Sequence, residues 1–141
     1  MSIHFSTVNS SFVLDEEKKI TDWIKLIIKN NNCRVGEIGY LFCDDEYLLE
    51  VNRKYLNHDT YTDIITFDYV SGNLVSGDIM ISVDRIRDNA KLFSVPFEQE
   101  LHRVIIHGIH HLLGQGDKTE EEATAMRKRE NDSLALWETM N

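Results

Sequence analysis

The stretch 101-LHRVIIHGIHHLLGQGDKTEEE-122 carries most of what the sequence indicates about the fold and the chemistry. At about 100° per residue, its isoleucines and leucines fall on one side of a helix, which would pack into a core. His107, His110 and His111 fall on the other side, together with Arg103. We therefore predict a helix whose apolar side is buried and whose histidines face a cleft or solvent.

Two of these histidines have the spacing of metal ligands. His107 and His111 lie one turn apart, about 6 Å along the axis, which suits two corners of a tetrahedral site. Gly114 can end the helix in a left-handed conformation and Gly116 keeps the return loop permissive, so that Asp117 can reach the same point. Two imidazoles and one carboxylate leave a fourth position open, as a catalytic zinc site requires. We predict one Zn²⁺ per chain on these three residues; the alternative is a solvent-exposed histidine face.

Gly108 bears on the kind of chemistry. In zinc peptidases of the His-Glu-x-x-His type, the residue after the first histidine is a glutamate that acts as general base. Here that residue is Gly108, which disfavours peptide hydrolysis. A glycine inside a helix costs about 1 kcal/mol relative to alanine. Gly108 has two possible roles. It could leave clearance for substrate or for a neighbouring backbone, or it could allow close helix packing.

The rest of the chain mixes helical and strand patterns, which predicts an α+β fold with about four strands in a mixed sheet and about five helices. The expected strands are 3–8, 36–43, 62–67 and 77–83, and the expected helices are 15–30, 44–55, 84–92, 96–113 and 119–138. The run 62–67 is β-branched and aromatic throughout, so we expect both of its faces to be covered. Gly72, Asn73 and Gly77 should form the turn that precedes the fourth strand. Thr119 and Glu122 have the spacing of a capping box.

Composition limits the class of protein. The chain has 141 residues, a length that suits one domain spanning 1–141, and a formal net charge of −9. Two cysteines make no disulfide framework, and no apolar run is long enough to cross a bilayer, so we expect a cytoplasmic protein without a membrane partner. A binder of nucleic acid is normally basic, so a metal or a local patch would have to supply positive charge. The candidates for such a patch are Arg85, Arg87, Lys91 and Arg103, although residues of this kind are more often solvated surface charges. Lys128 and Arg129 should pair with acids on their own helix.

The segment H107-G-I-H-H-L-L-G-Q-G-D117 resembles the His-Gly-x-x-His-x-x-Gly-x-x-His signature of rRNA maturation factors of the YbeY type. Segments 51–67, 77–82 and 120–126 resemble the family's other motifs in the same order, so the similarity covers about residues 36–130. The resemblance implies a metal-dependent endoribonuclease domain with a metal cleft at the edge of a mixed sheet. It also implies single-stranded rRNA precursors as substrates, 16S 3′-end maturation, ribosome quality control, and the small ribosomal subunit or its proteins as partners. DNA is not expected.

This sequence departs from the family pattern at several positions. Asp117 stands in place of the third histidine; it is a competent zinc ligand, but it should leave the bound water slightly less acidic. Leu56 replaces an arginine that would contact phosphate, and Tyr61 replaces a proline. His110 replaces a leucine and is not counted as a ligand. Arg53 lies near the position of the missing arginine, as does its neighbour Lys54.

Two other functions remain open. A non-catalytic ribosome assembly factor would use the metal structurally, with His58 or His102 as a fourth protein ligand. A zinc hydrolase of peptides is the less favoured alternative, because of Gly108. The sequence identifies no general base and no substrate-binding residue. Asp63 could orient a metal-bound histidine or cap the end of its strand.

Overall fold

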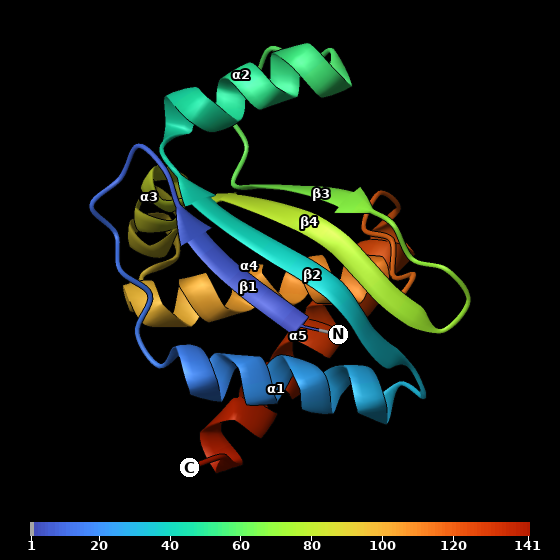
Figure 1. The fold of residues 1–141 in the computed structure, drawn as a ribbon. Coiled ribbons are helices and arrows are strands. Elements are labelled where there is room, and N and C mark those ends of the chain that lie inside the picture. The colour runs from blue at the N-terminus through green and yellow to red at the C-terminus, as the bar shows by residue number, and fades with distance from the viewer. Residues whose placement is uncertain (1) are drawn as a thin grey trace.

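The computed structural model describes residues 2–141 and contains four strands and five helices (Figure 1). In chain order they are β1 (Ser2–Thr7), α1 (Glu17–Asn30), β2 (Arg34–Cys43), α2 (Asp45–Leu56), β3 (Ile64–Asp68), β4 (Leu74–Ser82), α3 (Val83–Phe93), α4 (Phe97–Leu112) and α5 (Glu120–Thr139). The strands form one sheet in the order β1-β2-β4-β3, in which only β3 is antiparallel to its neighbour. The predicted α+β class and mixed sheet are therefore confirmed.

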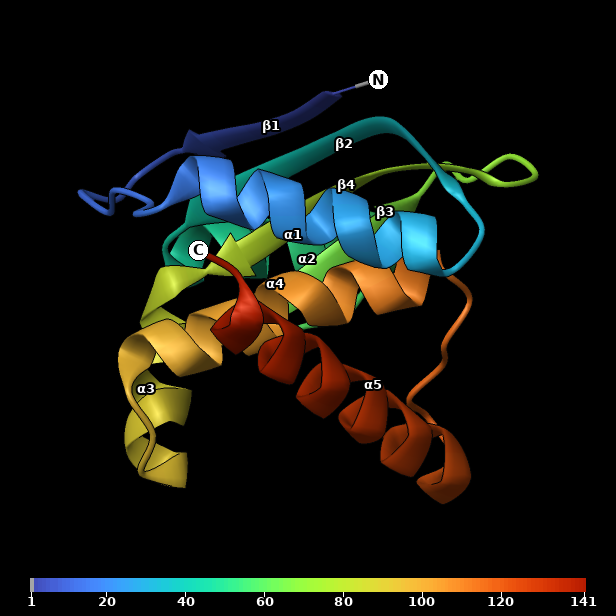
Figure 2. The ribbon, with the colours of Figure 1, turned by 90° about the horizontal axis from the view of Figure 1, so that it is seen from below.

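The helices cover the sheet unequally. Helices α1 and α4 pack on one face, with α5 outside them, whereas α2 lies on the opposite side (Figures 1 and 2). The main core joins the isoleucines of α1 and α4 to inward side chains of β2 and β4. A smaller cluster lies under α2, where Cys43, Leu48, Val51 and Ile65 meet. Helix α4 is thus enclosed between the sheet and α5. Within the part of the chain that the structure describes, no helix combines the length and apolarity needed to cross a membrane.

Local sequence signals account for most element boundaries. Pro96 precedes the first residue of α4, and Thr119 and Glu122 form the predicted capping box at the start of α5. Strand β3 is an edge strand with both faces covered, as expected, because Ile64 packs toward α4 and Ile65 toward α2. These signals act within a few residues, which is why the sequence alone reveals them.

Two boundary predictions were wrong. Helix α1 begins at Glu17 rather than after Asp15, and its N-cap Glu16 has a left-handed backbone with no side-chain cap. Strand β4 begins at Leu74 rather than at Gly77, so Gly77 lies inside the strand, paired with Asp68 of β3. A Cβ at Gly77 would come within 2.6 Å of the Phe67 carbonyl oxygen, so the glycine permits the close approach of the neighbouring strand.

The glycines around α4 determine where its C-terminal end points. Gly108 faces the sheet, where a Cβ would lie 2.9 Å from Ile79 Cδ1, so close packing explains this glycine rather than access for substrate. After α4 ends, Gly114 adopts a φ of 97°, in the left-handed region as predicted. A Cβ at Gly116 would lie 2.6 Å from a carboxylate oxygen of Glu122, so this glycine provides space rather than unusual backbone angles. The loop can therefore fold back against the start of α5.

Candidate metal centre

Three side chains meet at the C-terminal end of α4. His107 and His111 come from its last turns, and Asp117 comes from the loop that folds back behind Gly114. One oxygen of Asp117, Oδ2, lies 3.2 Å from His107 Nε2 and 3.3 Å from His111 Nε2. The two imidazole rings stand nearly perpendicular, with their centres 4.6 Å apart. The three predicted ligand residues therefore share one point in space.

The donor set suits a divalent metal ion. One ligand atom from each residue lies within 4.8 Å of the other two, and all three side chains are partly exposed. Two imidazoles and one carboxylate are the donors of an open zinc site. Among residues 2–141, no fourth histidine, cysteine, aspartate or glutamate joins this group. The arrangement can hold an ion and leave room for a further ligand; ligation itself stays a prediction.

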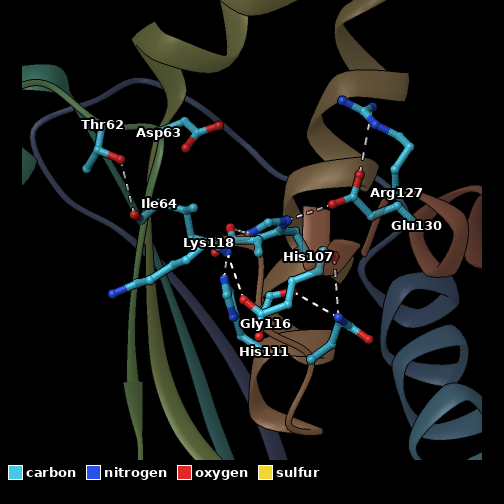
Figure 3. A network of polar contacts seen from close by, with 12 residues as sticks. Thr62, Asp63, Ile64, His107, His111, Gly116, Lys118, Arg127 and Glu130 are labelled. Atoms are coloured by element: carbon cyan, nitrogen blue, oxygen red, sulfur yellow. Dashed lines mark hydrogen bonds and ion pairs between the residues drawn. The ribbon is translucent and has the colours of Figure 1, made fainter. Parts of the chain in front are cut away.

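Glu130 of α5 orients one of the histidines (Figure 3). His107 Nδ1 donates to Glu130 Oε2 over 2.6 Å, and Arg103 donates to Glu130 Oε1 over 2.9 Å. Arg103 also donates to Asn131 Oδ1 over 2.9 Å, which fixes the guanidinium. Because Nδ1 is bound to Glu130, Nε2 is the ring nitrogen that faces Asp117 and can offer a lone pair to a metal ion. Glu130 thus selects the tautomer and ring orientation that a metal would need.

The pKa values of His107 and Glu130 follow from their burial and from the charges around them. Burial lowers the pKa of His107, but the hydrogen bond with Glu130 and the charges of Glu130, Asp117 and Asp63 outweigh it, so the pKa is raised. Burial raises the pKa of the Glu130 carboxyl, but hydrogen bonds from His107 and Arg103 bring it below its usual value. The raised pKa of His107 and the lowered pKa of Glu130 both favour an ionised Glu130 carboxylate, which accepts the hydrogen bond from His107 Nδ1–H.

Sequence reasoning missed Glu130, although α5 carries a signal for it. The buried residues of this helix are Met126, Glu130, Ser133 and Trp137, which are spaced as one face. Two polar residues within a core stripe indicate buried hydrogen-bond partners. Only the packing of α5 against α4 shows that those partners are histidines.

His110 was wrongly predicted to face outward. It is 3% exposed, and its Nε2 lies 2.8 Å from Ser133 Oγ on α5. Burial lowers its pKa to about 4, with a smaller contribution from the charge of Arg129. The helical pattern gave the direction of this side chain correctly, but α5 covers that direction. His110 is therefore a core histidine, whereas His107 and His111 reach the surface.

A cleft of about 640 Å³ opens beside the three converging residues. Its walls come from the end of α2, the loop 57–63, strand β3 and the end of α4. Asp63 lines this cleft, and burial raises the pKa of its carboxyl despite the opposing charge of His107. Asn89 donates to Asp63 Oδ2 over 3.4 Å, whereas the hydrogen bond at His107 Nδ1 goes to Glu130. His58 also lines the cleft, whereas His102 is buried against Trp137.

The expected basic rim is mostly neutralised. Arg85 Nη2 lies 2.8 Å from Asp45 Oδ2, Arg87 pairs with Asp84, and Arg103 pairs with Glu130. Lys91 is an exposed residue in the last turn of α3. Elsewhere, Lys128 pairs with Asp132 on its own helix as predicted. Of the described residues that line the cleft, Lys118 is the only lysine or arginine.

Comparisons with known proteins agree on one family. The sequence profile of the family described as endoribonuclease YbeY matches residues 5–138. Proteins named Endoribonuclease YbeY from Flavobacterium johnsoniae and Phocaeicola vulgatus are 52% and 54% identical to this chain. The first alignment covers 91% of this chain and 92% of the relative, and the second covers 86% and 88%.

A solved structure supports the fold. The solution structure of TM1509 from Thermotoga maritima matches with a TM-score of 0.67 and 23% identity, over 98% of this chain and 93% of that one. The resemblance that rested on the histidine segment is confirmed by a match over nearly the whole chain. This chain belongs to the endoribonuclease YbeY family.

Proposed function

We propose that His107, His111 and Asp117 hold one Zn²⁺ ion with which this chain, an endoribonuclease by family, cleaves single-stranded RNA. The observation that carries this proposal is the convergence of two Nε2 atoms and one carboxylate oxygen within 4.8 Å, on the wall of a cleft. The bound zinc would supply a Lewis acid for a phosphoryl oxygen and would lower the pKa of the attacking water. The side chains around the site would hold the ion, orient its ligands and set the charge of the centre.

Each residue around the centre has a distinct task. His107 and His111 present Nε2 from adjacent turns of a helix that the sheet and α5 hold rigidly. Glu130 keeps the proton of His107 on Nδ1, so that Nε2 stays free to bind. Asp117 contributes a negative charge where the family signature has a neutral imidazole. The centre therefore carries one positive charge less than a three-histidine site would.

The proposed cellular substrate rests on the resemblance of residues 107–117 to the signature of YbeY-type rRNA maturation factors. We propose precursors of rRNA, with maturation of the 16S 3′ end and ribosome quality control as the processes served. The small ribosomal subunit or its proteins would present the RNA, in the cytoplasm. Because Arg85, Arg87 and Arg103 are paired with acids, the chain would depend largely on the metal and on such partners for positive charge.

The structure disfavours the two alternatives. A closed structural zinc site needs a fourth protein ligand, and His102 is buried against Trp137, away from the cleft. His58 lines the cleft without joining the three donors. Peptide hydrolysis of the His-Glu-x-x-His type would need a carboxylate at residue 108, and Gly108 is buried against Ile79. A three-donor centre open to a cleft is the arrangement of an enzyme.

Cleavage of an unstructured RNA by the purified, zinc-loaded chain tests the proposal. His111→Ala, prepared identically, controls for contaminating ribonuclease, and a duplex of the same sequence tests strand selectivity. We expect cleavage by the wild type, none by the variant, and loss of cleavage after chelation with recovery on adding zinc. Equal cleavage by wild type and variant, or cleavage that resists chelation, would refute the zinc mechanism.

A further inference from the structure

Tyr61 places an aromatic ring in the same cleft as the candidate metal centre. It belongs to the loop between α2 and β3, lines the cleft and is 49% exposed. An exposed aromatic ring on the wall of a cleft is a surface that a flat ligand can cover. Leu56, at the end of α2, lines the cleft as well and is 43% exposed. The cleft therefore offers a partly apolar wall in addition to its carboxylates and imidazoles.

The Tyr61 ring is held in place on two sides. Its hydroxyl donates to Glu46 Oε1 over 2.6 Å, and the guanidinium carbon of Arg85 lies 5.4 Å from the ring centre. Arg85 is itself fixed by Asp45, to which its Nη2 and Nε donate over 2.8 and 3.3 Å. Asp45 also accepts a hydrogen bond from Ser82 Oγ over 2.6 Å. A ring anchored in this way loses little conformational entropy when a flat ligand covers it.

The charges in the cleft favour stacking over phosphate pairing. Lys118 is the only lysine or arginine among the described residues that line it, whereas Asp63, Asp68 and Asp117 contribute carboxylates. A nucleic-acid strand in this cleft thus meets few cations apart from a bound metal. Base–aromatic stacking is the remaining strong and sequence-tolerant contact for a single strand.

We propose that Tyr61 is a stacking platform for one unpaired nucleobase of the RNA, and that it is a determinant of single-strand selectivity. This inference rests on the proposed function, because it takes RNA as the occupant of the cleft. A base in a duplex is already stacked on its neighbours, so it cannot cover the Tyr61 ring without unpairing. Arg85 supports the ring from one side and the base covers what remains accessible.

Fluorescence anisotropy with a short labelled, unstructured RNA tests the stacking contact in the zinc-loaded protein. Tyr61→Leu keeps an apolar side chain but removes the ring, and Tyr61→Phe keeps the ring. We expect Tyr61→Leu to weaken binding roughly tenfold, as loss of one stacked base does, and Tyr61→Phe to stay within about threefold of wild type. Tyr69→Leu is the matched control, since Tyr69 is 59% exposed but does not line this cleft.

A set of RNAs with one abasic position each makes the test specific for stacking. At one position, loss of the base should weaken binding to the wild type about tenfold and have no further effect on Tyr61→Leu. Equal effects of every abasic position on the two proteins, or normal binding by Tyr61→Leu, would overturn the proposal.

RNA integrity on gels, in the same samples, reports cleavage separately. If RNA binds without being cut, the proposed function fails while stacking is still tested; if no RNA binds, both fail.

Discussion

The histidines of α4 lie in two contrasting environments. His107 and His111 face the cleft and meet carboxylates, whereas His102 and His110 are buried against α1 and α5. Carboxylates raise the pKa of His107 against the effect of burial, while burial lowers the pKa of both His102 and His110 to about 4. What surrounds a histidine, more than its place on the helix, decides whether it can serve a metal or the core.

The sharpest test of this contrast compares His111→Ala with His110→Ala. Replacing a residue that only orients a metal ligand lowers metal affinity roughly 10–100-fold. Removing the ligand itself in His111→Ala should therefore lower zinc affinity by more than about a hundredfold, with little change in metal-free stability. His110→Ala should keep its zinc but lose about 1–3 kcal/mol of unfolding free energy, because Ser133 loses its partner and a cavity forms. Chelator competition and urea unfolding measure the two quantities. Zinc loss in His110→Ala, or zinc retained in His111→Ala, would break the comparison.

Glu130→Gln addresses the support of the metal centre. The amide is nearly isosteric, but it holds the Nδ1 proton of His107 less strongly and no longer neutralises Arg103. We expect zinc affinity to fall roughly 10–100-fold, as it does when the hydrogen-bond partner of a metal-binding histidine is replaced. Asp132→Asn is the matched control, because Asp132 is an exposed carboxylate of α5 that pairs with Lys128. Equal zinc affinity for both variants would show that Glu130 does not support the metal centre.

The buried histidines make a prediction about pH. His110 has a folded pKa of about 4, below the ordinary 6.5, so its stabilising contribution is present above pH 6.5 and is lost as the pH falls toward 4. Between pH 7 and pH 5 this loss should be about 1–2 kcal/mol for His110. Urea unfolding of the metal-free wild type and His110→Gln at both pH values measures it as a difference. A wild type and variant that lose stability in parallel would contradict the assignment.

Gly108→Ala tests the sheet-facing side of α4, with the smallest effect. The new Cβ would lie 2.9 and 3.1 Å from atoms of Ile79 and 3.2 Å from Ile64 Cδ1. Overpacking costs typically 1–3 kcal/mol, and better helix propensity returns about 1, so we expect a net loss of about 1 kcal/mol. Zinc affinity should not change. A large loss of zinc binding without a loss of stability would mean that Gly108 serves the cleft.

Local rules made much of this molecule predictable from its sequence. The capping box at Thr119, the start of α4 after Pro96 and the left-handed Gly114 depend on neighbours a few residues away. The convergence of His107, His111 and Asp117 follows from the same local geometry, a helical turn and a short return loop.

The features that were missed depend on contacts between distant segments. The partner of His107 lies 23 residues further along the chain, on a helix whose docking the sequence pattern does not specify. The same docking buries His110, whose direction alone was predictable. Gly77 is required by the carbonyl of Phe67 on the adjacent strand, which no local rule reveals. Helical and turn patterns thus gave the three converging residues but not the helix that supports them.

The most direct test of the central claim is a titration of zinc into metal-free protein while cleavage of an unstructured RNA is followed. If His107, His111 and Asp117 form a single catalytic zinc site, activity should rise linearly and level off at one equivalent per chain. His111→Ala should stay inactive throughout the titration. Full activity in the metal-free protein, or activity in His111→Ala that rises with zinc as in the wild type, would contradict the account.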